Sequence, residues 1–195
     1  RVSRLKVKSS ASAITSSFPG KSARRCKERC PGSVNDFKDS YLGRLRELAG
    51  NRLILMPGAR CLIERADGHI LMQKRTDNGL WCMPSGYAEA GEDIFQVMLR
   101  EVREETGLEV LDAKPWGFAS NPRYETMHYP NGDVVQAFGL DFHASEWRGE
   151  LYADCEETLA LNWFSPDALP ASLEGHVRAV ARFREFKRTG VFQLY

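Results

Sequence analysis

The sequence is constrained most by a loop that leads directly into a carboxylate-rich helix, GYAEAGEDIFQVMLREVREETGL, at residues 86–108. Residues 94–106 are expected to form the helix, because two acidic residues precede them at the end where a helix favours negative charge and Gly107 follows as a stop. At 100° per residue, three side chains share an arc of about 100° on one side of this helix. They are Glu101, Glu104 and Glu105.

Three carboxylates at these spacings repel one another, by about 0.2–0.5 kcal/mol for each exposed pair. One interpretation is a solvated helix face whose charge is partly offset by Arg100 and Arg103. The other is a site for Mg²⁺ or Mn²⁺, which prefer oxygen ligands and retain water for chemistry. Charge spacing alone leaves both open. The loop before the helix favours the cation, because its small and turn-forming residues let the backbone approach a ligand closely. These residues are Pro84, Ser85, Gly86 and Gly91.

The same stretch resembles the signature of the Nudix hydrolase family. That pattern is Gly, any five residues, Glu, any seven, Arg-Glu, an aliphatic residue, any one, Glu-Glu, any one, Gly and a final aliphatic residue. Every fixed position is filled, by Gly86, Glu92, Arg100, Glu101, Val102, Glu104, Glu105, Gly107 and Leu108. Trp81-x-x-Pro84 and the Asn-Trp-Phe segment at Trp163 extend the resemblance, whereas Ser85 stands where many relatives have glycine. The resemblance implies an α/β fold, an α/β/α sandwich with a mixed sheet, over roughly residues 50–190.

The resemblance also implies roles for the residues of this signature. Three glutamates would hold Mg²⁺ or Mn²⁺ together with the carbonyl of Ser85, and they are Glu101, Glu104 and Glu105. Glu101 would also assist deprotonation of water. Arg100 would orient Glu101, and Glu92 would brace both through a salt bridge.

The implied activity is metal-dependent hydrolysis of a nucleoside diphosphate linked to another moiety, such as ADP-ribose, a dinucleoside polyphosphate or a sugar nucleotide. Water would attack one phosphorus of the pyrophosphate. Two alternatives stay open. One is a non-catalytic module of the same fold that binds a nucleotide or RNA, and the other is removal of oxidised nucleoside triphosphates.

Residues outside the signature are candidates for substrate binding. Lys74 and Arg75 end a strand that leads toward the loop, where they would meet phosphate oxygens unless they are simply exposed. Tyr124 lies 16 residues beyond Leu108, close to where relatives that cleave dinucleoside polyphosphates place a tyrosine. Glu156 and Glu157 precede a strand and are candidates for a general base or a further metal ligand, with a solvated acid pair as the alternative.

Apolar periodicity and turn residues outline the rest of the domain. Residues 35–49 are predicted to form an amphipathic helix that packs on the domain or, as the alternative, on a second subunit in a homodimer. Strands are predicted at residues 53–63, 69–74, 134–142 and 159–164, the first two joined as a hairpin by the turn at Asp67-Gly68. Ser165-Pro166 suggests a helix start, and residues 173–190 a C-terminal helix.

The N-terminal segment differs from the remainder in charge. Residues 1–32 carry nine Lys or Arg and one acid, whereas the other residues sum to a net charge of −7. This basic, serine-rich leader is expected to be disordered and to serve as an organelle-targeting segment, a nucleic-acid-binding arm or a plain extension. The predicted organisation is therefore a leader at 1–32, a helix at 33–50 and a hydrolase domain at 51–195.

Composition bounds the class of protein and its location. The chain is 43% hydrophobic and 27% charged, which is typical of globular domains, and no apolar run approaches the ~20 residues needed to cross a bilayer. Its five cysteines are odd in number and scattered, which does not suggest a disulfide framework. We therefore expect a cytoplasmic protein with a small nucleotide as its partner and no membrane contact, in which nucleic acid is bound only through the leader.

Overall fold

A computed structural model describes residues 37–153 and 156–195. The leader and its predicted disorder lie outside these residues. The helices are the 3₁₀ turn η1 (Phe37–Asp39), α1 (Tyr41–Ala49), α2 (Ile94–Thr106), α3 (Pro122–Glu125) and α4 (Glu174–Thr189). The strands are β1 (Ile54–Ile63), β2 (Ile70–Arg75), β3 (Trp81–Cys82), β4 (Ser85–Tyr87), β5 (Glu109–Ala119), β6 (Thr126–His128), β7 (Val134–Arg148), β8 (Thr158–Phe164) and β9 (Gln193–Leu194).

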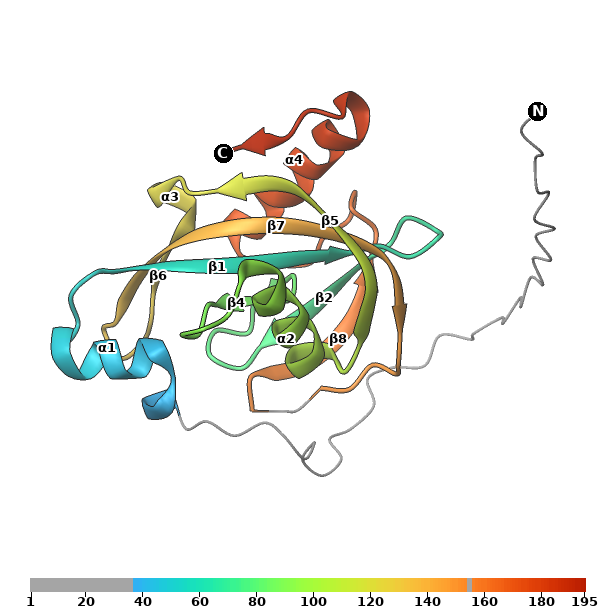
Figure 1. Ribbon diagram of the computed structural model, residues 1–195. Coiled ribbons are helices and arrows are strands. Elements are labelled where there is room, and N and C mark those ends of the chain that lie inside the picture. The colour runs from blue at the N-terminus through green and yellow to red at the C-terminus, as the bar shows by residue number, and fades with distance from the viewer. Residues whose placement is uncertain (1–36, 154–155) are drawn as a thin grey trace, which may run out of the picture.

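The strands form two sheets between the larger helices (Figure 1). The first sheet has the order β4-β1-β7-β5-β9, and β6 also pairs with β7. It is mixed, because β1 runs parallel to β7 while β4 and β5 are antiparallel to their neighbours β1 and β7. The second sheet is antiparallel, in the order β3-β2-β8. The predicted mixed sheet is confirmed.

The core has two halves because successive side chains of β1 point to opposite faces of the sheet. Cys61 and Ile63 pack with Val97 and Val102 of α2 on one face. On the other face, Leu62 of β1, Met72 of β2 and Trp116 of β5 pack with residues of α4. The α4 residues include Ala179 and Phe183. Helices therefore cover both faces, which is the α/β/α sandwich that the resemblance implied.

The N-terminal helix α1 packs on the domain against residues of β1 and β7. Ser40 caps it, its Oγ accepting a hydrogen bond from the Gly43 N–H at 2.9 Å, so the helix starts at Tyr41 and not near residue 35 as predicted. Leu42 is buried against strand residues, whereas Leu48 is 86% exposed. Packing on the domain is thus confirmed for part of the predicted apolar stripe.

Two further sequence predictions need correction. The turn at Asp67-Gly68 is present, with φ of 81° at Gly68, but β1 and β2 share only the bridge Glu64–Ile70 and then pair within different sheets. Ser165-Pro166 opens a turn and not a helix, because Pro170 has no N–H to continue a helical ladder. The last long helix, α4, begins at Glu174.

No helix within the described part of the chain is long and apolar enough to cross a membrane.

Candidate active site

The carboxylate helix α2 is fixed at both ends by its own sequence. The Asp93 carboxylate accepts hydrogen bonds from the N–H groups of Phe95 and Gln96, both at 2.9 Å, and the Gln96 side chain accepts one from the Asp93 N–H. Gly107 ends the helix with φ of 74°, a conformation that suits glycine. The predicted bounds of this helix, 94–106, are confirmed.

Two of the three predicted metal ligands are buried beneath the loop that precedes α2. Glu105 accepts a hydrogen bond from the Ser85 N–H at 2.8 Å and is 5% exposed. Glu101 lies directly under Gly86, where a Cβ atom would come within 2.0 Å of its Oε1. Only glycine at position 86 leaves room for this carboxylate. Glu104 lies at the outer edge, with 43% of its side chain exposed.

Arg100 ties these groups together. Its Nε and Nη2 donate to the two carboxylate oxygens of Glu92 at 2.6 and 2.9 Å, a bidentate pair. Its Nη1 donates to Glu101 at 2.7 Å and to Glu104 at 3.2 Å, and its Nη2 also reaches the carbonyl of Tyr87 at 3.0 Å. The guanidinium therefore joins the loop to the helix and holds Glu101 in place.

Burial sets the electrostatics of this cluster. It raises the pKa of Glu101 to about 7, with the Glu104 and Glu157 charges adding to the rise and Arg100 opposing it. Burial likewise raises the pKa of Glu105 well above its usual range, and the charge of Glu101 is the second-largest cause of this rise. Arg100 therefore offsets the negative charge of these two buried carboxylates only in part. A divalent cation supplies positive charge.

Residues 37–153 and 156–195 contain no preassembled group of three or more His, Cys, Asp or Glu side chains around one metal position. Glu101 and Glu104 are turned to Arg100, and Glu105 to the Ser85 N–H. The donor set nevertheless fits Mg²⁺ or Mn²⁺, because it offers several carboxylate oxygens from one helix face beside a backbone carbonyl, and Arg100 offsets the charge of its buried acids only in part.

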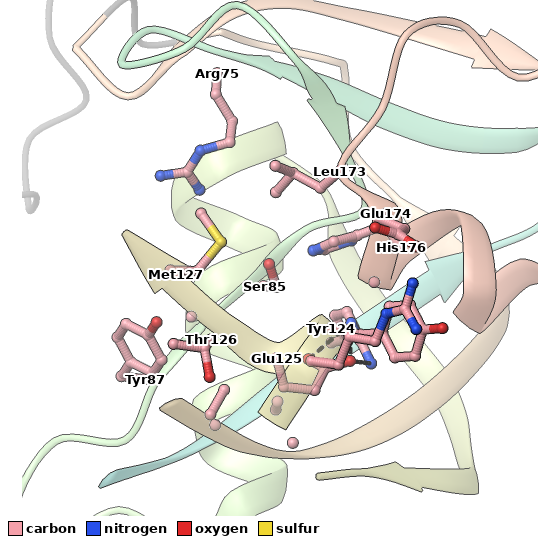
Figure 2. Close-up of a pocket in the computed structure, with 18 of the residues that line it drawn as sticks. Arg75, Ser85, Tyr87, Tyr124, Glu125, Thr126, Met127, Leu173, Glu174 and His176 are labelled. Atoms are coloured by element: carbon pink, nitrogen blue, oxygen red, sulfur yellow. Dashed lines mark hydrogen bonds and ion pairs between the residues drawn. The ribbon is translucent and has the colours of Figure 1, made fainter. Parts of the chain in front are cut away.

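A cavity of about 280 Å³ lies beside the loop (Figure 2). Segments far apart in the sequence line it: β1, the end of β2, β4, the α3–β6 segment, β7 and the start of α4. Its size is close to the lower end of the range for small-molecule sites. Ser85 and Gly86 belong both to its wall and to the metal-ligand cluster, so the cavity and the carboxylates share the loop.

A buried charge network supports the wall of this cavity. Arg60 of β1 donates from Nε to Asp141 of β7 at 2.7 Å and from Nη1 to Glu125 of α3 at 3.3 Å. The Tyr195 hydroxyl donates to the same Asp141 at 2.5 Å. Burial raises the pKa of Glu125, and Arg60 opposes the rise. This network fixes Glu125 at the cavity surface.

The structure places two of the three predicted substrate-binding residues at the cavity. Arg75 and Tyr124 line the cavity, and the Tyr124 ring lies against Arg178 at 4.5 Å and Arg123 at 5.4 Å. Lys74 is not part of the cavity lining within the described residues. Glu157 is close enough to raise the pKa of both buried glutamates.

Several residues of the site were missed by sequence reasoning. They are Arg60, Glu125, Asp141, His176 and Gln73, whose amide oxygen accepts from the Thr158 hydroxyl at 2.5 Å beside Glu105. Each comes from a different element and follows no local spacing. A buried arginine inside an apolar strand, ARCLI, was the one local signal that could have suggested a charge network.

Comparison with known proteins identifies the family. Residues 54–184 match the NUDIX domain. The chain is 34% identical over 113 residues to the NAD-capped RNA hydrolase NudC of Vibrio vulnificus, covering 54% of this chain and 37% of that protein. It is 30% identical over 113 residues to a putative 8-oxo-dGTP diphosphatase of Bacillus subtilis, covering 58% of this chain and 68% of that protein. The chain thus spans little more than a third of the NudC relatives.

Solved structures agree with this assignment. A MutT NUDIX hydrolase from Burkholderia pseudomallei superposes with a TM-score of 0.56 at 25% identity, covering 66% of this chain and 98% of that chain. An ADP-ribose pyrophosphatase from Streptococcus suis has the same fold, with a TM-score of 0.54 at 23% identity over 72% of this chain and 98% of that chain. The signature, the sandwich fold and these matches show that the chain belongs to the Nudix hydrolase family.

Proposed function

We propose that the protein hydrolyses the pyrophosphate of a nucleoside diphosphate linked to another moiety, with Mg²⁺ or Mn²⁺ held by Glu101, Glu104, Glu105 and the Ser85 carbonyl. The observation that carries this proposal is the arrangement of the carboxylates. Two buried glutamates and one exposed glutamate lie on one helix face, and the same loop that covers them lines a cavity. The proposed cation site, which would bind the phosphates, therefore lies next to a cavity that has space for the rest of a nucleotide.

The bound cation would neutralise the diphosphate, acidify a water and stabilise the leaving oxygen. The protein's own residues would position these parts. Arg100 keeps Glu101 oriented while Glu92 neutralises the arginine, so that the helix face stays anionic toward the cation. Glu101, held in place by Arg100, would also assist deprotonation of that water. Arg75, at the cavity, would contact phosphate oxygens.

The substrate class is supported by the relatives. One is named for NAD-capped RNA and one structural neighbour for ADP-ribose, which both contain a nucleoside diphosphate linked to a further group. The cavity volume of about 280 Å³ suits one nucleoside-sized group, with the other half of such a substrate left outside. We therefore place the substrate among small nucleotides of the ADP-ribose, dinucleoside polyphosphate or sugar-nucleotide type.

A second candidate activity is hydrolysis of oxidised nucleoside triphosphates. The putative 8-oxo-dGTP diphosphatase of Bacillus subtilis is the relative of which this chain covers the larger share, 68%. In that case pyrophosphate would be a product, whereas a linked nucleoside diphosphate would give a mononucleotide and a phosphorylated partner.

The test is a panel of nucleotides incubated with Mg²⁺ or Mn²⁺, with the products identified by mass spectrometry. ADP-ribose, diadenosine polyphosphates, sugar nucleotides and 8-oxo-dGTP cover both candidates. We expect metal-dependent release of a mononucleotide from the first group. Pyrophosphate released from 8-oxo-dGTP alone would favour the second candidate, and no turnover of any compound would contradict both.

The adjacent residues Glu156 and Glu157 allow a matched test of the general base. Glu157 contributes to the raised pKa of Glu101 and Glu105, and Glu156 is the adjacent residue of the same type. We propose Glu157 as a base or further metal ligand and expect Glu157→Gln to reduce kcat by roughly a hundredfold or more. Glu156→Gln is the control and should leave kcat within about threefold. Equal effects of the two changes would remove this role.

A further inference from the structure

His176 occupies a position in the cavity wall that the family signature does not cover. It lies in the first turn of α4 and is 8% exposed. Its Nδ1 accepts a hydrogen bond from the Met83 N–H at 3.0 Å. A backbone N–H can only donate, so Nδ1 carries a lone pair and the neutral ring carries its hydrogen on Nε2. The loop before the carboxylate helix thus fixes the tautomer of this histidine.

The remaining ring nitrogen is available to a ligand. The His176 side chain lines the cavity, and within residues 37–153 and 156–195 no acceptor is hydrogen-bonded to Nε2 (Figure 2). Burial, followed by the charges of Arg60 and Arg75, lowers the pKa of the ring well below its usual range. The group that faces the cavity is therefore an uncharged N–H donor.

An acceptor lies on the same side of the cavity. Glu125 lines the wall, and its Oε1 would be 3.2 Å from a Cβ atom placed on Gly175, the residue before His176. The Tyr124 carbonyl would be 2.7 Å from that Cβ, so glycine at 175 allows α3 and α4 to meet closely. The Arg60 contacts to Glu125 are long, 3.3 to 3.5 Å, and leave lone pairs of the carboxylate for other donors.

The part of the wall around His176 favours a flat, uncharged group, whereas Arg75, which also lines the cavity, is the residue that we propose contacts phosphate oxygens. Four glycines, Ala137, Met127 and Leu173 contribute uncharged surface, and Tyr87 and Tyr129 also line the cavity. A carboxylate at the cavity surface disfavours a bound anion and favours a donor. A nucleobase edge that carries an acceptor next to a donor matches this pairing of an N–H with a carboxylate.

We propose that His176 is a specificity-determining residue that donates from Nε2 to an acceptor on the nucleobase of the substrate, while Glu125 accepts from a neighbouring donor on the same base. The inference rests on the proposed function, because it assigns the base of that substrate to the cavity. The carboxylate helix binds what all these nucleotides share, their phosphates. His176 and Glu125 distinguish their bases.

The test compares four sugar nucleotides that differ only in the base: ADP-glucose, GDP-glucose, UDP-glucose and CDP-glucose, each with Mn²⁺. In His176→Phe the donor is lost, and we expect the KM of the preferred compound to rise at least tenfold, kcat to stay within threefold, and the base preference to collapse. His176→Gln retains an acceptor for the Met83 N–H and a donor for the base, and it should restore most of the preference. His143→Gln is the control, since that residue bonds to Glu64 and is not part of the cavity lining described.

The outcomes separate the two proposals. If the wild-type protein hydrolyses none of these compounds or those of the wider panel, the proposed function is wrong. If it does and His176→Phe keeps the same base ranking and KM, the inference about His176 is wrong. A uniform fall in kcat for all four bases would show a purely structural role and would also overturn it.

A binding measurement tests the inference without turnover. In ¹⁵N-labelled protein, the His176 resonances should report the Nε2–H tautomer throughout pH 6–8. Titration with AMP, GMP, UMP and CMP should shift the Nε2–H signal with at least one of them, and Glu125→Gln should weaken that response. An Nδ1–H tautomer, or no shift with any of the four, would contradict the proposal.

Discussion

The carboxylate helix and the cavity beside it are built in opposite ways. The helix with its loop is a continuous stretch of 23 residues, in which caps, ion pairs and ligand candidates follow from local spacing. The cavity draws on six segments that are up to 118 residues apart, from Gly58 to His176. The comparison teaches that the chemistry of this protein is encoded locally, whereas its choice of substrate depends on the whole fold.

The buried charge network gives the sharpest way to separate the two regions. Arg60→Met leaves Asp141 and Glu125 buried without their cation, which should destabilise the protein by about 3–5 kcal/mol in urea unfolding. The control is Arg148→Met, which removes an exposed ion pair with Glu109 and should leave the unfolding midpoint unchanged within error. Similar midpoints for the two variants would show that the network does not hold the cavity together.

Gly86 is the residue at which the two regions meet. In Gly86→Ala the new methyl group would overlap the Glu101 carboxylate, which would have to leave its place beside Arg100. We expect kcat/KM to fall by about a hundredfold with little loss of folded protein. Gly139→Ala is the control at the same cavity, because its Cβ has only an ordinary contact with the Gly58 carbonyl at 3.9 Å. Equal activities of the two variants would contradict the close packing described for Glu101.

The pH dependence of stability separates the cavity from the carboxylate helix by its sign. The raised pKa values of Glu101 and Glu105 make acid favour folding, whereas the lowered pKa of His176 acts in the opposite direction. The pKa of His176 is lowered in the folded protein, so the unfolded chain binds this proton first as the pH falls through about 6.5. Protonation of this one group therefore favours unfolding as the pH falls below about 6.5. His176→Gln should remove that part of the decrease in unfolding free energy, whereas the exposed His128→Gln should not. Parallel curves for all three proteins would contradict the buried neutral state of His176.

Sequence reasoning succeeded where the signal is local and failed where it is not. The bounds of α2, its stop at Gly107 and the mixed sheet were predicted from periodicity, turn residues and the family signature. Ion pairs between side chains of different strands were not predicted. Arg60 contacts Asp141 only because β1 and β7 lie side by side in the sheet. The turn between β1 and β2 was predicted correctly. The separation of the two strands into different sheets beyond the bridge Glu64–Ile70 was not predicted, because it depends on pairing with β7 and β8, which lie far away in sequence.

The substrate residues show the same limit. Tyr124 was chosen from its distance to the signature, and Arg75 because it ends a strand that leads toward the loop. The structure places both at the cavity, but the reasoning that chose Arg75 also chose Lys74, which is not part of the lining described. His176 had no signal at all. A single histidine in an amphipathic helix is recognisable only when the tertiary fold brings its Nδ1 to the Met83 N–H.

The central claim is that the glutamates of α2 bind a catalytic divalent cation. Glu104 tests it best, because its exposed side chain can be changed without disturbing the buried core. We predict that Glu104→Gln abolishes Mg²⁺- or Mn²⁺-stimulated hydrolysis of the best nucleotide in the panel while the thermal unfolding midpoint is retained. The exposed Glu109→Gln, beyond the end of the helix, should keep full activity. Unchanged metal-stimulated turnover in Glu104→Gln would contradict the account.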